Sequence, residues 1–137
     1  MREILFKAKR IDNGEWVEGY LYKKYFQELP HDRFVIEYKT TGSEYEWTPK
    51  YMVAEINPET LCQYTGLTDK NGNKIWENDV VAIKDMTSIG KVLFEKEYCS
   101  YLIRIGAGRY VRDIGRFTKD SEVIGNIFDN ADLISEV

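Results

Sequence analysis

Apolar and polar residues alternate with a period of two along most of this chain, and no long stretch shows a helical period. Residues 4–8 place Ile4, Phe6 and Ala8 on one face of a predicted strand. The pair Asn13-Gly14 separates this strand from a second alternating run over residues 15–22, and such an arrangement predicts a β-hairpin. Two further strands are predicted over residues 33–38 and 45–54.

The second half of the chain predicts a meander of antiparallel strands. Alternation recurs over residues 79–84, 90–95 and 98–105, and a final strand is predicted over residues 122–128. Two short helical segments are also predicted. Asn57 followed by Pro58 favours a single helical turn, because asparagine caps helix N-termini and proline suits the first helical position. Asn130 favours a short terminal helix over residues 131–136.

Together these elements predict a mainly β fold, in which antiparallel hairpins and a meander form a compact β-barrel or sandwich with one or two short helical turns. The run Asn78-Asp79-Val80-Val81, followed by Gly90-Lys91-Val92, is similar to the opening strands of small SH3-like barrels. Such a barrel is therefore an alternative for the C-terminal half. A chain of 137 residues without a linker is expected to form a single domain over residues 1–137. Two subdomains, 1–60 and 61–137, are the alternative.

The composition, 43% hydrophobic and 31% charged, is typical of a chain that can build a core. No apolar run is long enough to span a membrane, and the charged N-terminus lacks the apolar segment of a signal peptide. We therefore expect a cytoplasmic protein that does not bind membranes. Cys62 and Cys99 are far apart and form no CxxC pair, so both are expected to be free thiols.

The densest cluster of turn-forming residues lies within residues 61–81, which read LCQYTGLTDKNGNKIWENDVV. The pair Asn71-Gly72 suits both positive-φ positions of a type I′ turn, so a tight hairpin is predicted here. Asp79 begins the next strand, where its side chain is expected to bond backbone amides of the preceding turn.

This segment resembles the signature of the YopX family, and residues 122–134, EVIGNIFDNADLI, resemble the tail of the same family. The resemblance implies a mainly β accessory protein of bacteriophages or prophages, and it supplies no catalytic residues. Asn78 stands where the family usually has glycine, but asparagine also tolerates positive φ. The signature residues to which we assign structural roles are Tyr64, Gly66, Asp69, Asn71, Gly72, Asp79, Gly125 and Asn126.

Motifs for metal binding and catalysis are incomplete. Asp69, Asn71 and Asn73 have the spacing of the first ligands of an EF-hand, but Lys74 and Val80 occupy the positions that need glycine and a bidentate acid. The single histidine, His31, has no neighbouring ligand. We therefore predict no metal, no cofactor and no catalytic residues. The alternative is a phage-encoded enzyme with an unrecognised carboxylate site near Asp69, Glu77 and Asp79.

Charge is distributed unevenly, although the net charge is only −4. Residues 104–119 carry five basic residues against one acid, whereas residues 120–137 carry five acids and no base. Arginines interleaved with aromatic residues can grip phosphates and stack bases. The alternative is that these arginines pair with the acidic tail, within the chain or across a subunit boundary. The candidate binding residues are Arg104, Arg109, Tyr110, Arg112, Arg116 and Phe117.

The sequence thus favours a non-enzymatic β module that binds a macromolecule or assembles with copies of itself. Its expected partners are a second copy of the chain or a phage or host protein, with nucleic acid as a further hypothesis.

Overall fold

The computed structural model describes residues 1–24, 33–40, 50–83, 88–106, 108–111 and 113–134, and statements below refer to these ranges. The chain divides into two compact units, residues 1–63 and residues 64–137. Each unit has its own cluster of buried apolar side chains. The predicted strands 45–54 and 79–84 and the predicted helix 131–136 extend in part beyond the described ranges, and Arg112 and His31 lie outside them.

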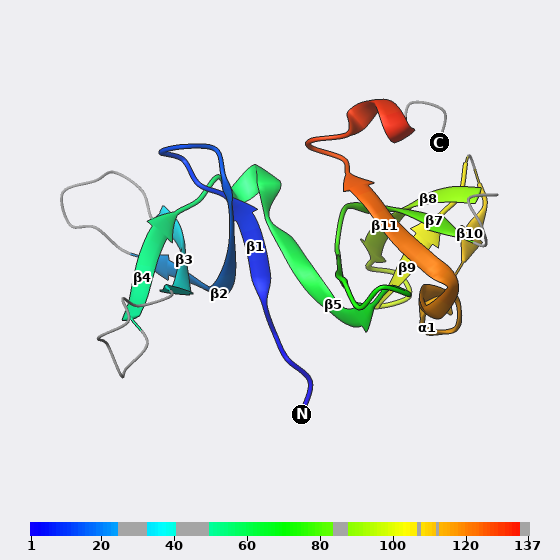
Figure 1. Cartoon of the computed structure of the whole chain (residues 1–137), viewed down its shortest axis with the longest axis horizontal. Coiled ribbons are helices and arrows are strands. Elements are labelled where there is room, and N and C mark those ends of the chain that lie inside the picture. Colours follow the sequence, from blue (N-terminus) through cyan, green and yellow to red (C-terminus); the bar gives the residue numbers. More distant parts are fainter. Residues whose placement is uncertain (25–32, 41–49, 84–87, 107, 112, 135–137) are drawn as a thin grey trace. The chain divides into compact units, whose positions relative to one another are not determined.

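The first unit is an antiparallel arrangement of β1 (Phe6–Lys9), β2 (Trp16–Lys24), β3 (Arg33–Thr40) and β4 (Lys50–Glu55), followed by the 3₁₀ turn η1 (Pro58–Thr60) (Figure 1). The strands follow the order β4-β3-β2-β1, and β1 also pairs with the start of β5 (Cys62–Thr68). The Asn57 side chain accepts the Glu59 N–H at 3.1 Å, as predicted for a capping residue. The core contains Ala8, Val17, Ile36, Ala54 and Ile56.

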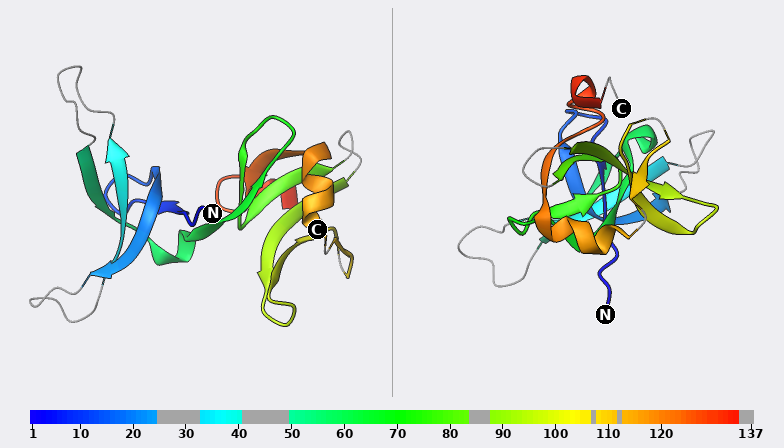
Figure 2. Two further views of the ribbon diagram at one scale, coloured as in Figure 1. Left: turned by 90° about the horizontal axis from the view of Figure 1, so that it is seen from below. Right: turned by 90° about the vertical axis from the view of Figure 1, so that its right-hand side faces the viewer.

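Strand β2 pairs with two different strands along its length. Its residues up to Gly19 pair with β1, and its residues from Tyr20 pair with β3. Gly19 lies at the change of partner. A Cβ atom placed there would lie 2.0 Å from the Glu37 carbonyl oxygen. The close approach of the two backbones therefore requires glycine at this position. Figure 2 shows β2 as a curved ribbon beside β3.

The second unit contains a meander of β7 (Asp79–Ile83), β8 (Ser88–Glu95) and β9 (Ser100–Arg104), with β6 (Lys74–Trp76) paired to β5. The strand β10 (Tyr110–Val111) pairs with β9, and β11 (Ser121–Asn126) pairs with β7 (Figure 1). The remaining elements are the helix α1 (Ile114–Phe117) and the 3₁₀ turns η2 (Thr118–Asp120) and η3 (Ala131–Ile134). The core contains Ile75, Val81, Ile83, Val92, Ile103 and Ile114.

The mainly β, antiparallel fold and the meander are thereby confirmed. The barrel alternative, including an SH3-like barrel in the C-terminal half, is wrong for the described residues. The five-stranded sheet has the order β10-β9-β8-β7-β11, and its two outer strands do not pair with each other. The sheet is therefore open. Cys62 is a buried free thiol and Cys99 is an exposed one, as predicted.

Two local predictions differ from the structure. Asn130 does not cap the last helical segment with its side chain, because its Oδ1 accepts the Asn126 N–H at 3.2 Å, and the segment is the 3₁₀ turn η3. The hairpin loop between β5 and β6 is not a type I′ turn, since Gly72 has a φ of 81° but Asn71 does not have positive φ. No helix among the described residues is long and apolar enough to cross a membrane.

Candidate functional site

The Asp69 carboxylate connects the β5–β6 hairpin to the last strand of the second unit. Its Oδ1 accepts the N–H groups of Asn71 and Asn73 at 2.9 Å each, and its Oδ2 accepts the Val123 N–H of β11 at 2.9 Å. The residue is only 5% exposed. Burial acts to raise the pKa of Asp69, but the backbone N–H groups of Val123, Asn73 and Asn71 outweigh it and hold the pKa below its ordinary value. An ionised carboxylate held in this way is a structural group.

The same carboxylate explains why the loop is wider than a type I′ turn. Gly72 donates its N–H to the Asp69 carbonyl at 3.0 Å, and the Asp69 N–H bonds the Asn73 carbonyl at 2.9 Å. A three-residue turn closed by a left-handed glycine is the common alternative to the two-residue hairpin. It directs the amides of Asn71 and Asn73 toward the side chain of Asp69.

The second acidic residue of the signature, Asp79, is also held by backbone. It is 2% exposed, and its Oδ2 accepts the Trp76 N–H at 2.8 Å. Asn78, in the turn between Trp76 and Asp79, adopts the predicted positive φ, with a value of 71°. The Tyr64 ring packs against Trp76 with ring centroids 5.5 Å apart, and Gly66 has a φ of 88° in the irregular part of β5. These contacts favour a structural role for the signature over the hypothesis of a carboxylate site with Glu77.

The tail residues of the signature form a tight turn after β11. The Asn126 side-chain oxygen accepts the N–H groups of Phe128 and Asp129 at 2.9 Å each. A Cβ atom on Gly125 would lie 2.4 Å from Oδ1 of Asn130, the atom that accepts the Asn126 N–H. Glycine is therefore needed for the turn to close on the strand.

The predicted basic binding residues do not form one surface. Arg104 pairs in register with Lys91 on one side and Tyr110 on the other, so these three residues form a row across β8, β9 and β10. The adjacent row faces the other side of the sheet, where Val92 and Ile103 are core residues and Val111 packs against the core. Helix α1, which carries Arg116 and Phe117, packs on that core through Ile114. Arg104 and Tyr110 therefore lie on one face of the sheet, whereas Arg116 and Phe117 belong to the helix that packs on the other face. Arg109 precedes β10, and Arg112 lies outside the described residues.

The alternative, pairing of these arginines with the acidic tail, is not what the described part of the chain shows. No acidic side chain there forms an ion pair with Arg104 or Arg109, and Arg116 approaches only Asp113, at 3.9 Å. Glu122 of the tail is approached by Lys70 instead, at 3.6 Å. Tyr110 also borders a hollow of about 190 Å³ that contains Glu95 and Glu97, so its surroundings are partly acidic.

In the part of the chain that the structure describes, the most exposed apolar segment of regular structure lies in strand β4. Tyr51, Met52 and Val53 are consecutive and are 56%, 50% and 45% exposed. Ala54 and Ile56, which follow, are buried. Strand β4 is the last strand of its sheet, so Tyr51–Val53 (below, the free edge) has a paired strand, β3, on one side only among the described residues.

Two residues of the free edge, Tyr51 and Val53, direct backbone groups away from β3, and these groups have no partner among the described residues. Ile56 donates its N–H to Phe34 of β3, whereas Glu55 directs its carbonyl the other way and accepts the Ile11 N–H at 3.0 Å. Because backbone groups alternate sides along an antiparallel strand, Tyr51 and Val53 direct their N–H and C=O groups to the same side as Glu55. No backbone group in the described ranges bonds to them there.

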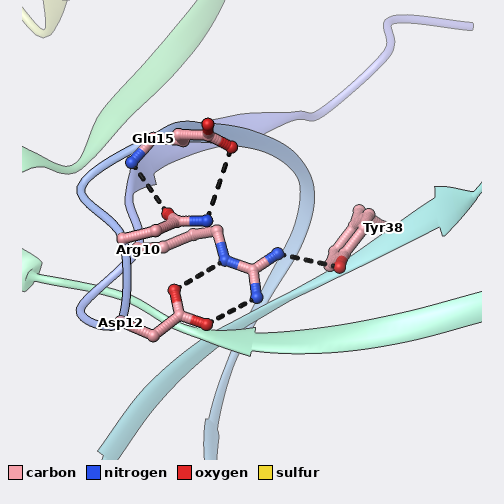
Figure 3. A network of polar contacts seen from close by, with 5 residues as sticks. Arg10, Asp12, Glu15 and Tyr38 are labelled. Carbon is pink, nitrogen blue, oxygen red and sulfur yellow. Dashed lines mark hydrogen bonds and ion pairs between the residues drawn. The ribbon is translucent and has the colours of Figure 1, made fainter.

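The turn between β1 and β2 determines where the free edge ends. Arg10 donates from Nε and Nη2 to the Asp12 carboxylate at 2.9 and 2.8 Å, and from Nη1 to the Tyr38 hydroxyl at 2.9 Å (Figure 3). The hydrogen bond to Asp12 and, to a smaller extent, the one to Tyr38 raise the pKa of Arg10. The hydrogen bond from Arg10 in turn lowers the pKa of Asp12. Arg10 forms a β-bridge with Ile56, which brings Ile11 onto Glu55.

A hollow of about 260 Å³ lies where this turn meets β4. Its lining consists of Arg10, Ile11, Asp12, Val53, Ala54 and Glu55. The Glu55 carboxylate also forms an ion pair with Arg33, in which the closest atoms are 2.6 Å apart. Apolar side chains and two carboxylates thus border the end of the free edge.

Sequence reasoning predicted a strand here but missed the free edge. The alternation of residues 45–54 places alternate side chains on two faces, and it cannot show which strand lies last in the sheet. The signal that could have identified the site is the run Tyr51-Met52-Val53, since three consecutive large apolar residues leave at least one on the solvent side of a half-buried strand.

Comparisons with known proteins support the fold and a family assignment. The crystal structure of protein EF1440 from Enterococcus faecalis matches with a TM-score of 0.56 and 18% sequence identity, covering 98% of this chain and 100% of that chain. At this identity the likeness shows the fold alone. No curated protein matches the chain. The family model described as YopX protein matches residues 5–135, nearly the whole chain. The chain therefore belongs to the YopX protein family.

Proposed function

We propose that this chain is a non-enzymatic β protein that assembles with copies of itself through the free edge of β4. The observation that supports the proposal is that the outward backbone groups of Tyr51 and Val53, which have no partner in the described ranges, coincide with three consecutive exposed apolar side chains. Such an edge is a template for pairing with another strand. Edges that must remain free usually carry charges, proline or a bulge. Tyr51–Ala54 contain no charge and no proline, and Pro49 and Lys50 stand only before them.

The proposal is tested by placing a charge in the middle of the edge. A Val53→Lys variant keeps the strand but adds a lysine, the residue that most often protects natural edges. Ile4→Lys is the matched control, because Ile4 is 52% exposed and lies outside the strands. Light scattering across a concentration series should show association for the wild type and the Ile4 variant, and a monomer for Val53→Lys. A wild type that stays monomeric up to about 1 mM would overturn the proposal.

Nucleic-acid binding is the second candidate. It is favoured by the absence of an acidic partner for Arg104 and Arg109 among the described residues, and by their position beside Lys91 and Tyr110. It predicts that single-stranded DNA is retained at low salt and released as salt rises. An Arg104→Glu and Arg109→Glu double variant should lose that retention. Retention that survives the double substitution would exclude this surface.

The same proposal places the protein in the bacterial cytoplasm as an accessory protein of a phage or prophage, as the family resemblance implies. It assigns the protein no catalytic activity, because the signature carboxylates of Asp69 and Asp79 are engaged by backbone N–H groups.

A further inference from the structure

We infer that the free edge of one copy pairs with the free edge of a second copy, antiparallel and about a two-fold axis at Met52. This inference rests on the proposed self-assembly and adds the partner's register and the number of copies. A two-fold axis relates equal surfaces, so each residue that contacts the second copy is itself contacted in the same way.

The free backbone groups select the register. With the axis at Met52, Tyr51 of one copy lies opposite Val53 of the other, and the reverse pair forms on the other side of the axis. Both residues direct their N–H and C=O groups outward, so each of the two pairs exchanges both hydrogen bonds across the interface. All the unpaired groups of Tyr51 and Val53 are then used.

The symmetric register with its axis at Val53 is excluded by a bond already present. Moving the axis by one residue, to Val53, places Tyr51 opposite Glu55. The Glu55 carbonyl already accepts the Ile11 N–H at 3.0 Å. Registers that pair an odd-numbered with an even-numbered residue place the core face of one copy beside the outer face of the other. They are therefore incompatible with a two-fold axis.

Side chains fit the same register. Tyr51 lies opposite Val53 of the second copy on one face, and the two Met52 side chains meet on the other, so all three exposed apolar residues gain a neighbour. Lys50 of the second copy lies opposite Ala54, which lines the 260 Å³ hollow together with Asp12 and Glu55.

This pairing limits the number of copies. The edge of each copy is consumed by the other, so assembly through β4 ends at a closed dimer and does not continue as an extended sheet. If β4 of one copy instead bound a different surface of the next copy, each end of the assembly would keep an unused binding surface, and further copies could add.

A cysteine at the axis tests the register directly. In a non-hydrogen-bonded antiparallel pair the two Cα atoms are about 4.5 Å apart, within the range that a disulfide bridges. A Met52→Cys variant in a Cys99→Ser background should therefore form a covalent dimer under mild oxidation, and the buried thiol of Cys62 stays unreactive. Lys50→Cys in the same background is the matched control, because the two Lys50 residues would be about 14 Å apart along the strands.

We expect at least about tenfold more covalent dimer from Met52→Cys than from Lys50→Cys, measured on a non-reducing gel. Association by light scattering without this difference would overturn the register and leave the proposed self-assembly standing. A mass that grows beyond the dimer and disappears in Val53→Lys would overturn the closed dimer. A monomer at every concentration would overturn the inference and the proposed function together.

Discussion

Among single residues, Asp69 makes the contacts on which most of the central signature depends. Its carboxylate holds three backbone N–H groups, two in its own loop and one on β11. Hydrogen bonds to charged groups are stronger than those between neutral ones, and a buried donor left without a partner is unfavourable. The residue is therefore expected to contribute to stability and not to turnover.

Asp69→Asn should lower the free energy of unfolding by about 2 kcal/mol, because one side-chain oxygen becomes an amide donor that faces another donor. Urea denaturation measures the change. Asp113→Asn is the control, because that carboxylate is 68% exposed and forms only a 3.9 Å pair with Arg116. Equal stability of both variants would contradict the structural role of Asp69.

The difference between wild type and Asp69→Asn should also depend on pH. The folded state lowers the pKa of Asp69, so its contribution is present above the ordinary carboxyl pKa and is lost as pH falls through the lower, folded value. Denaturation at a series of pH values should show the two proteins converging below about pH 4. A constant difference down to pH 2 would show that the charge of Asp69 does not matter.

Gly125→Ala and Gly115→Ala form a matched pair of substitutions in the same unit. The new Cβ would lie 2.4 Å from the Asn130 side chain in the first variant, and in the second it would meet nothing within 4 Å. We expect Gly125→Ala to lose about 1–3 kcal/mol through overpacking, and Gly115→Ala in helix α1 to be neutral or up to about 1 kcal/mol more stable. Thermal unfolding followed by circular dichroism distinguishes the two.

Among the elements, the pairing of β2 with β3 requires a glycine at position 19, because the two backbones approach closely there. Gly19→Ala would place a Cβ atom 2.0 Å from the Glu37 carbonyl oxygen, and the backbone of β3 cannot move aside as a side chain can. We expect a loss of about 3 kcal/mol or more, read from the midpoint of urea unfolding. A loss below about 1 kcal/mol would show that β2 and β3 separate easily at this point.

Most strands could be predicted from the sequence because one face of each is buried, which enforces alternation. The strand β10 and the helix α1 were not predicted, since two and four residues are too short to show a period. The free edge of β4 was missed for a different reason. Strand order depends on pairings between distant residues, such as Ile36 with Ala54, which a local pattern does not contain.

The candidate binding residues also show that a local sequence pattern does not reveal which residues share a surface. Arg104 and Arg116 are close in sequence, but Arg104 lies on the sheet face opposite the core, whereas Arg116 belongs to a helix that packs on the core through Ile114. Charge counted along a chain therefore does not show which basic residues share a surface. The structural roles of Asp69 and Asn78 were more predictable because they arise from contacts within a few residues.

For the whole molecule, the two units have core clusters that share no residue. This leads to a test of the single-domain prediction. Ile36→Ala and Ile103→Ala each remove a side chain that is at most 1% exposed, one in each unit, and each should destabilise by about 2–5 kcal/mol. We expect hydrogen exchange to quicken only in the unit that carries the substitution. Faster exchange throughout the chain in both variants would favour one cooperative domain.

The position of β11 has a consequence for the order of events during synthesis. Every strand pairing described for the first unit is complete once residue 63 has emerged from the ribosome, whereas β7 and the Asp69 carboxylate wait for residues 121–126. The first unit can thus fold while translation continues. The second can close only after residues 121–126 have emerged as well, so a premature stop codon shortly before position 121 would leave β7 without its partner β11.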